Sequence, residues 1–150
     1  MQLLIGNRNY SSWSMRAWVL MRALDLPFET RMVRFDGFEP DSTFKRTLAA
    51  YPCAGKVPVL VEGDLAVWES LAIVEYLADR FPERAIWPTD RTQRARARTL
   101  CAEMHAGFAA LRSACPMNIE AELPAVRTWM EDARAEQDFR PFEEPYRSAP

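Results

Sequence analysis

Apolar residues follow different spacings in the first third of the chain, and each spacing predicts a different element. Leu3-Leu4-Ile5 is an unbroken apolar run, which predicts a short buried strand. From Ser11 or Ser12 to Leu24 the apolar positions recur every three or four residues, which predicts a helix with a serine N-cap. Residues 28–33 alternate and predict a second strand. This order normally means parallel pairing through a right-handed crossover.

A short helix is expected within residues 42–50, and the stretch 55–70 then predicts strand, turn, strand and helix start. Pro58 cannot donate to a sheet ladder, so it belongs at the first residue of a strand or on an edge, where a cis bond after Val57 is feasible. Gly63-Asp64 supplies the hairpin turn. A helix begins after Trp68, because apolar residues recur at helical spacing as far as Phe81. The predicted order is β-α-β-α-β-β-α.

The remaining chain predicts helices, and a boundary is expected at residue 82. We expect one domain over residues 1–82 and a second, all-helical domain over residues 83–150, with residues 87–90 as linker and cap. The long segment that ends at Ala114 carries an apolar stripe, which is most simply explained by helix packing. The members of this stripe are Ala97, Leu100, Cys101, Met104, Phe108 and Leu111.

Composition limits the classes of partner. The 150 residues carry 19 basic and 21 acidic side chains, and a net charge of −2 gives no overall attraction to nucleic acid or an anionic membrane. No apolar run approaches the roughly 20 residues of a membrane span, so a cytoplasmic protein is expected. Three scattered cysteines and the single His105 predict neither a disulfide framework nor a metal site.

The hairpin and the helix start after it suggest a binding site. An outward main chain at Val57 could pair with an extended peptide. The free N–H groups and the Ser70 hydroxyl at the helix start suit a carboxylate, while the Glu69 carboxylate suits an ammonium. Together they fit the zwitterionic end of an amino acid, although both residues could instead serve only as helix caps.

The order of elements resembles the thioredoxin-like fold, and three motifs resemble one family with that fold, the glutathione S-transferases. Residues 9–16, Asn-Tyr-Ser-Ser-Trp-Ser-Met-Arg, are similar to the serine-type active-site turn of its zeta-like and bacterial members. Residues 56–60 and 68–70 are similar to the glutathione-binding segments. The resemblance implies a homodimeric transferase that activates the glutathione thiol as a thiolate for attack on a small electrophile, in the context of detoxification and without a metal.

The resemblance also implies roles for the serines of the turn. Ser11 takes the position of the hydroxyl that donates to the sulfur, Ser12 is the second candidate and Ser14 the third. Such a bond, together with the positive end of the helix, would favour the thiolate. Because no histidine lies nearby in the sequence, the serine is expected to donate a hydrogen bond and not to act as a nucleophile.

Further residues are assigned by the same resemblance. Val57, next to Pro58, would bind the cysteinyl main chain of glutathione, and Glu69 and Ser70 would hold its γ-glutamyl end. Lys56, or else Lys45 or Arg46, would meet the glycyl carboxylate. The electrophile would face Trp13, Met104, His105 and Phe108.

The sequence departs from the family pattern at residues 116–119. Relatives continue through several helices, whereas this chain passes to an amphipathic pattern at Val126, Trp129, Met130 and Ala133 and then to residues 139–147, which resemble the family's C-terminus. A shortened helical domain is therefore expected, through an internal deletion or a segment absent from the sequence. The alternatives are a non-catalytic glutathione-binding or protein-interaction module and a nucleic-acid-binding domain that uses Arg91, Arg94 and Arg98.

Overall fold

Four short strands form one mixed sheet in the computed structural model, which describes residues 1–114, 117, 128–129 and 131–132. The strands are β1 (Gln2–Ile5), β2 (Glu29–Met32), β3 (Val59–Glu62) and β4 (Leu65–Trp68), in the spatial order β2-β1-β3-β4. β1 and β2 pair in parallel, as the strand-helix-strand order predicts. β3 runs antiparallel to both β1 and β4.

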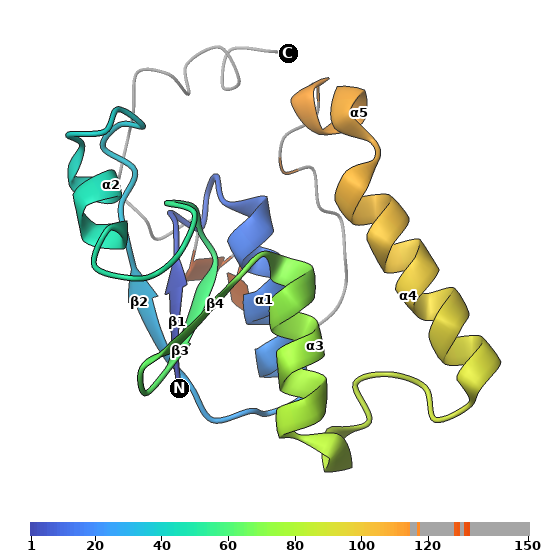
Figure 1. Cartoon of the computed structure of the whole chain (residues 1–150). Coiled ribbons are helices and arrows are strands. Elements are labelled where there is room, and N and C mark those ends of the chain that lie inside the picture. The colour runs from blue at the N-terminus through green and yellow to red at the C-terminus, as the bar shows by residue number, and fades with distance from the viewer. Residues whose placement is uncertain (115–116, 118–127, 130, 133–150) are drawn as a thin grey trace.

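The helices follow in the predicted order. They are α1 (Ser12–Ala23), α2 (Thr43–Leu48), α3 (Ser70–Arg80), α4 (Arg91–Ala106) and α5 (Ala109–Ala114), with a single 3-10 turn at Pro82–Arg84. The first seven elements therefore form the β-α-β-α-β-β-α order of a thioredoxin-like domain. Figure 1 shows α1 and α3 on one side of the sheet and α2 on the other.

The core lies on both faces of the sheet. Leu3 and Ile5 of β1 pack among buried residues of α1 and α3, whereas Leu4 packs on the opposite face with Phe44 and Leu48 of α2. All three β1 residues are fully buried, which explains why this strand is continuously apolar. Burial of each such side chain contributes about 1.5–3 kcal/mol to folding.

The hairpin forms one residue later than expected at its first strand. Pro58 lies immediately before β3, which is a central strand, so its missing N–H leaves the ladder intact. The Val57-Pro58 bond is cis. Gly63 has a φ of +59° at the β3–β4 turn, a conformation that glycine adopts without steric cost.

The long helical segment is divided into two helices, where the sequence predicts one continuous stretch. α4 begins after Asp90, whose Oδ1 accepts a bond of 2.8 Å from the Gln93 amide, and it ends at Ala106 with Gly107 as its C-cap. Phe108 then has a φ of +60°, which breaks the helix before α5. α4 has no buried residue, and Leu100, Met104, Phe108 and Leu111 are exposed. Among the described residues this stripe is therefore not covered by a packed helix.

One residue from the C-terminal third reaches the core of the first domain. Trp129 is fully buried and packs edge-on against Trp18 of α1, with ring centroids 5.3 Å apart. The other expectations for residues 115–150, including the departure at residues 116–119, the pattern at Val126, Met130 and Ala133 and the ending at residues 139–147, lie outside the described residues. The boundary at residue 82 and the extent of a helical domain over residues 83–150 stay predictions.

Candidate functional site

A chain of buried hydroxyls supports the loop between β1 and α1. Ser11 is the N-cap of α1, and its Oγ accepts a bond of 3.3 Å from the Ser14 amide. The two hydroxyl oxygens lie 2.6 Å apart. The Ser14 Oγ also accepts a bond of 3.1 Å from the Gly6 amide at the end of β1. Ser11 and Ser14 are thus held rigidly where β1 passes into α1.

The bond between the Ser11 and Ser14 hydroxyls uses one of their two protons, so the other proton is available to a ligand. With the Ser14 hydroxyl donating to Ser11, the Ser11 Oγ accepts two bonds and can direct its own proton to a ligand. Ser12 is the first residue of α1 and is half-buried, whereas Ser11 is buried. Both serines lie at the positive end of a 12-residue helix, where a negative charge is stabilised.

The start of α3 has an unusual backbone. Glu69 precedes Ser70 with a φ of +67°, an uncommon conformation for a residue with a side chain, which costs about 1–3 kcal/mol. Glu69 occupies the N-cap position of α3, but within the described residues no side chain forms a capping hydrogen bond there. The first N–H groups of α3 therefore remain open to an anion, and the Glu69 carboxylate stands beside them.

The main chain before β3 is also unpaired. In the described part of the chain, neither the N–H nor the C=O of Val57 forms a hydrogen bond, although Val59 already pairs with Leu4 in the sheet. The Val57 backbone can therefore receive an extended peptide in the manner of an added strand.

The three basic candidates near the hairpin differ in their availability. Lys56 and Arg46 are exposed. Lys45 donates from Nζ to the Gly55 carbonyl at 2.8 Å, which ties α2 to the loop before β3. Lys45 is thus engaged in the loop itself, and Arg46 donates to the Thr43 Oγ1 at 3.4 Å. Lys56 forms no such bond in the described part of the chain and can reach a ligand.

Trp13 in the first turn of α1 connects the helical segment to this region. Its ring lies edge-on to His105 of α4, with centroids 5.1 Å apart. The His105 Nε2 in turn lies 3.4 Å from the Glu69 Oε2. Met104 and Phe108, the other candidates for the electrophile side, have exposed fractions of 45% and 48%.

Two arginines complete the surroundings of Trp13 and were not singled out in the sequence. The Arg16 Cζ lies 4.1 Å from the Trp13 ring centroid, and the Arg112 Cζ lies 5.3 Å from it. Arg112 also donates to the Met104 carbonyl at 2.9 Å. Arg16 could have been found, because it follows Trp13 by three positions on a predicted helix. Nothing local in the sequence connects Arg112 to Trp13.

The basic face of α4 is partly engaged in contacts within the chain. Arg98 forms two bonds to the Glu75 carboxylate, at 3.0 and 2.7 Å, and Arg94 donates to the carbonyls of Pro88 and Thr89. Arg91 is exposed. Two of the three arginines on which the nucleic-acid alternative depended, Arg94 and Arg98, are therefore already bound within the chain.

The described residues contain neither a membrane-spanning helix nor a candidate metal site. No described helix is long and apolar enough to cross a bilayer. No group of three or more histidine, cysteine or acidic side chains in the described part of the chain is placed to hold a metal ion.

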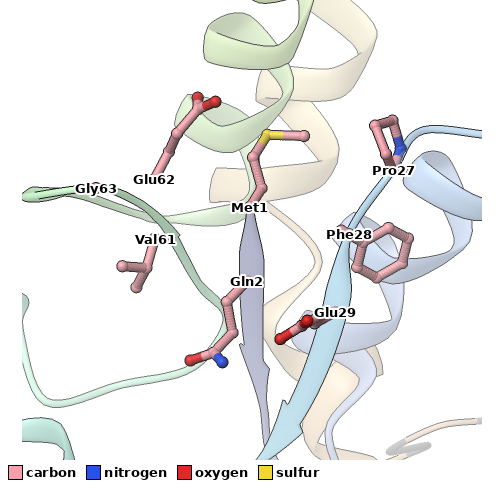
Figure 2. Close-up of a pocket in the computed structure, with 8 residues that line it drawn as sticks. All are labelled: Met1, Gln2, Pro27, Phe28, Glu29, Val61, Glu62 and Gly63. Atoms are coloured by element: carbon pink, nitrogen blue, oxygen red, sulfur yellow. The ribbon is translucent and has the colours of Figure 1, made fainter.

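A separate hollow of about 640 Å³ lies at the other end of the sheet, where β1 begins. Figure 2 shows it between Met1, the segment that enters β2 at Phe28, and the β3–β4 turn at Gly63. Its Glu62 carboxylate accepts a bond from Tyr76, which lowers the pKa of Glu62 and raises that of Tyr76. The hollow is distant in the fold from the end of β1, where the serine turn begins.

Comparisons with known proteins agree with this arrangement. Residues 10–80 match the family model described as glutathione S-transferase, N-terminal domain. The chain is 37% identical to glutathione S-transferase 1 of Dianthus caryophyllus over 95 residues, which are 63% of this chain and 41% of that protein. It is 30% identical to maleylacetoacetate isomerase of Pseudomonas aeruginosa over 135 residues, which are 88% of this chain and 58% of that protein.

The fold has counterparts among solved structures. A glutathione transferase homologue from Burkholderia GL BGR1, solved with bound glutathione, superposes with a TM-score of 0.68 at 20% identity, over 91% of this chain and 100% of that one. A glutathione transferase homologue from Sulfitobacter, also with bound glutathione, gives 0.61 at 24% identity, over 89% and 61% of the two chains. These likenesses show the same fold.

The chain spans about half the length of the two curated relatives named above. The match to the family model begins in the serine turn and includes the hairpin and α3. The fold, the family model and the curated relatives agree over this part of the chain, and residues 10–80 carry a glutathione S-transferase N-terminal domain.

Proposed function

We propose that this protein is a glutathione transferase, which binds glutathione along the hairpin and activates its thiol for attack on a small electrophile. The observation that carries the proposal is the uncapped start of α3 beside the unpaired main chain of Val57. The start of α3 offers N–H groups to the charged end of glutathione, and the Val57 main chain offers hydrogen bonds to its peptide backbone. The two features lie next to each other in the fold.

The γ-glutamyl end would bind at α3. Its carboxylate would accept bonds from the N–H groups at the helix start and from Ser70, and its ammonium would pair with Glu69. The strained φ of Glu69 supports this role, because backbone strain persists where the surroundings enforce it and is concentrated at ligand-binding sites.

The cysteinyl part would pair with Val57, in front of Pro58. Strand-like pairing uses both the N–H and the C=O of one residue, and in the described part of the chain both are without a partner. The glycyl carboxylate would then extend toward Lys56 or Arg46.

The sulfur would lie at the N-terminus of α1. The Ser11 proton is available once Ser14 donates to Ser11, and its bond to the sulfur would stabilise the thiolate together with the helix dipole. The thiolate attacks the electrophilic carbon and displaces its leaving group, or adds to it. Ser12 is the alternative donor, because it is the less buried of the two serines.

The electrophile would bind where α4 and α5 approach α1. Trp13 and His105 are in contact there, and Met104 and Phe108 supply apolar surface. We also propose that the protein is a cytoplasmic homodimer of a zeta-like subtype. These parts of the proposal are supported by resemblance alone.

Calorimetric titration with reduced glutathione tests the binding step. We expect a dissociation constant in the range of cellular glutathione for the natural chain and at least tenfold weaker binding for Glu69→Gln, because a charge-assisted bond is lost. Glu29→Gln, at the opposite end of the sheet, is the matched control and should bind normally. Equal binding by Glu69→Gln and the natural chain would remove Glu69 from the site.

A non-catalytic glutathione-binding or protein-interaction module is the second candidate, and the exposed stripe on α4 and α5 favours it. Leu100 and Leu111 are 58% and 56% exposed, which is typical of a surface that meets another molecule. Turnover of 1-chloro-2,4-dinitrobenzene distinguishes the two. Glutathione binding without any enzymatic rate above the uncatalysed reaction would establish the module.

A further inference from the structure

Two guanidinium groups lie against a single indole ring. Arg16 approaches the Trp13 ring from within α1, and Arg112 approaches it from α5. Both distances are measured to the same ring centroid. The separation of the two Cζ atoms therefore cannot exceed the sum of these two distances. The indole attracts each cation through its π-face but carries no net charge.

No acidic side chain neutralises this pair among the described residues. Arg16 makes neither a hydrogen bond nor an ion pair there, and the hydrogen bond of Arg112 goes to a neutral carbonyl. Glu69 is linked to this group only through His105, whose ring contacts Trp13 and whose Nε2 lies 3.4 Å from the Glu69 Oε2. The two positive charges therefore lie around the same ring without a counter-ion from the described part of the chain.

The surroundings make this arrangement costly for the free protein. Partial burial lowers the pKa of Arg16, the positive charge of Arg112 lowers it further, and Cys101 acts in the opposite direction. A bound anion would remove the repulsion, and groups with such perturbations gather at functional sites.

The pair also lies beside the proposed thiol position. Ser12 and Arg16 are four residues apart on α1 and so share one face of the helix. Trp13 connects the arginines to His105 and through it to Glu69. An anion held by the arginines would thus belong to the second substrate, because the glutathione carboxylates are accounted for at α3 and near Lys56.

We propose that Arg16 and Arg112 bind a carboxylate of the electrophile, with the planar part of that molecule against Trp13, so that the preferred acceptors are carboxylate-bearing electrophiles. Guanidinium groups suit this task because their forked N–H donors match the two oxygens of a carboxylate. This inference rests on the proposed transferase function and specifies its substrate class.

A pair of probes isolates the charge. 4-Chloro-3,5-dinitrobenzoate and its methyl ester react at the same carbon: the glutathione thiolate forms the C–S bond, the C–Cl bond breaks, and chloride leaves with the electron pair. The thiol proton goes to solvent. Each kcat/KM is divided by the uncatalysed rate constant of the same probe. This division corrects for the different intrinsic reactivity of the two rings toward the thiolate.

The test compares the natural chain with Arg16→Gln and Arg112→Gln. We expect each substitution to lower the corrected kcat/KM for the carboxylate about tenfold, because one charged hydrogen bond is lost. The corrected kcat/KM for the ester should stay within about twofold of the value for the natural chain. Arg91→Gln, on the exposed face of α4, is the control and should change neither value. An equal loss on both probes, or no loss on the carboxylate, would overturn the proposal.

A binding measurement separates this proposal from the transferase function. Unreactive 3,5-dinitrobenzoate is titrated calorimetrically into the natural chain and into Arg112→Gln, with and without glutathione. Binding of the benzoate that weakens about tenfold in Arg112→Gln supports the anion site even where no probe is turned over. Absence of benzoate binding under both conditions, or equal binding by the variant, overturns it whatever the outcome for glutathione. Arg112→Gln is the safer variant for folding, since α5 is at the surface.

Discussion

The Nε2 atom of His105 lies 3.4 Å from the Oε2 atom of Glu69, and this contact joins α4 to the start of α3. The Glu69 side chain is 48% exposed and that of His105 is 27% exposed. A pair in this environment contributes at most about 1 kcal/mol to stability. Its importance therefore lies in where it holds the Glu69 carboxylate.

Substitutions of the two partners should have different effects on ligand binding. His105→Gln removes the pair but keeps the Glu69 carboxylate, so glutathione should bind within about threefold of normal, whereas Glu69→Gln should weaken binding at least tenfold. Both variants should keep the same cooperative thermal transition within a few degrees. A loss of binding in His105→Gln as large as in Glu69→Gln would mean that the histidine contacts glutathione itself.

Ser11→Ala should impair thiol activation while glutathione still binds. Loss of the hydroxyl bond to the sulfur should raise the pKa of the bound thiol, because the thiolate loses a donor. Thiolate absorbance near 240 nm, followed against pH on the bound complex, measures this change. Ser12→Ala is the matched comparison, and a larger rise of the thiol pKa in Ser12→Ala would reassign the donor.

Ser14→Ala should act chiefly on stability. The substitution leaves the Gly6 amide without its acceptor in a buried position, which costs about 1–3 kcal/mol. Urea denaturation should therefore show a lower midpoint. An unchanged midpoint would mean that water replaces the hydroxyl.

Trp129 should stabilise the first domain although it is distant in sequence. It is fully buried, and its Nε1 donates to the Arg8 carbonyl at 3.0 Å. Trp129→Ala should cost about 3–5 kcal/mol, and Trp129→Phe less, since only the indole bond and part of the volume are lost. Trp68→Phe, at a residue 39% exposed, is the control for thermal unfolding. Equal midpoints for Trp129→Ala and the natural chain would contradict the packing of Trp129 against Trp18.

Asp36 should make stability depend on acid pH. Bonds from Thr43 and from the Phe44 amide, at the start of α2, lower the pKa of Asp36 to about 2. Because the folded value lies below the ordinary value near 4, this contribution is complete above about pH 4 and is lost as the pH falls toward 2. The free energy of unfolding of Asp36→Asn, measured by urea titration from pH 5 to pH 2, should fall less steeply than that of the natural chain. Parallel curves would contradict the assignment.

Much of the first domain could be predicted because its elements depend on local patterns. The apolar run of β1, the serine cap of α1 and the turn at Gly63 each occur where a short segment has only one favourable conformation. The helical part was predicted less well. The break between α4 and α5 depends on an extended backbone at Gly107 and a positive φ at Phe108, which the apolar periodicity of the segment does not reveal.

The sequence by itself determined the order of elements, the fold class and the three motifs that resemble glutathione S-transferases, because each of these depends on residues that are close together in the chain. Only the tertiary structure decided which side chains meet. It paired His105 with Glu69, placed Arg112 against Trp13 and buried Trp129 beside Trp18. The physical reason is that such contacts join residues far apart in the chain, so they depend on how helices pack and not on any local spacing.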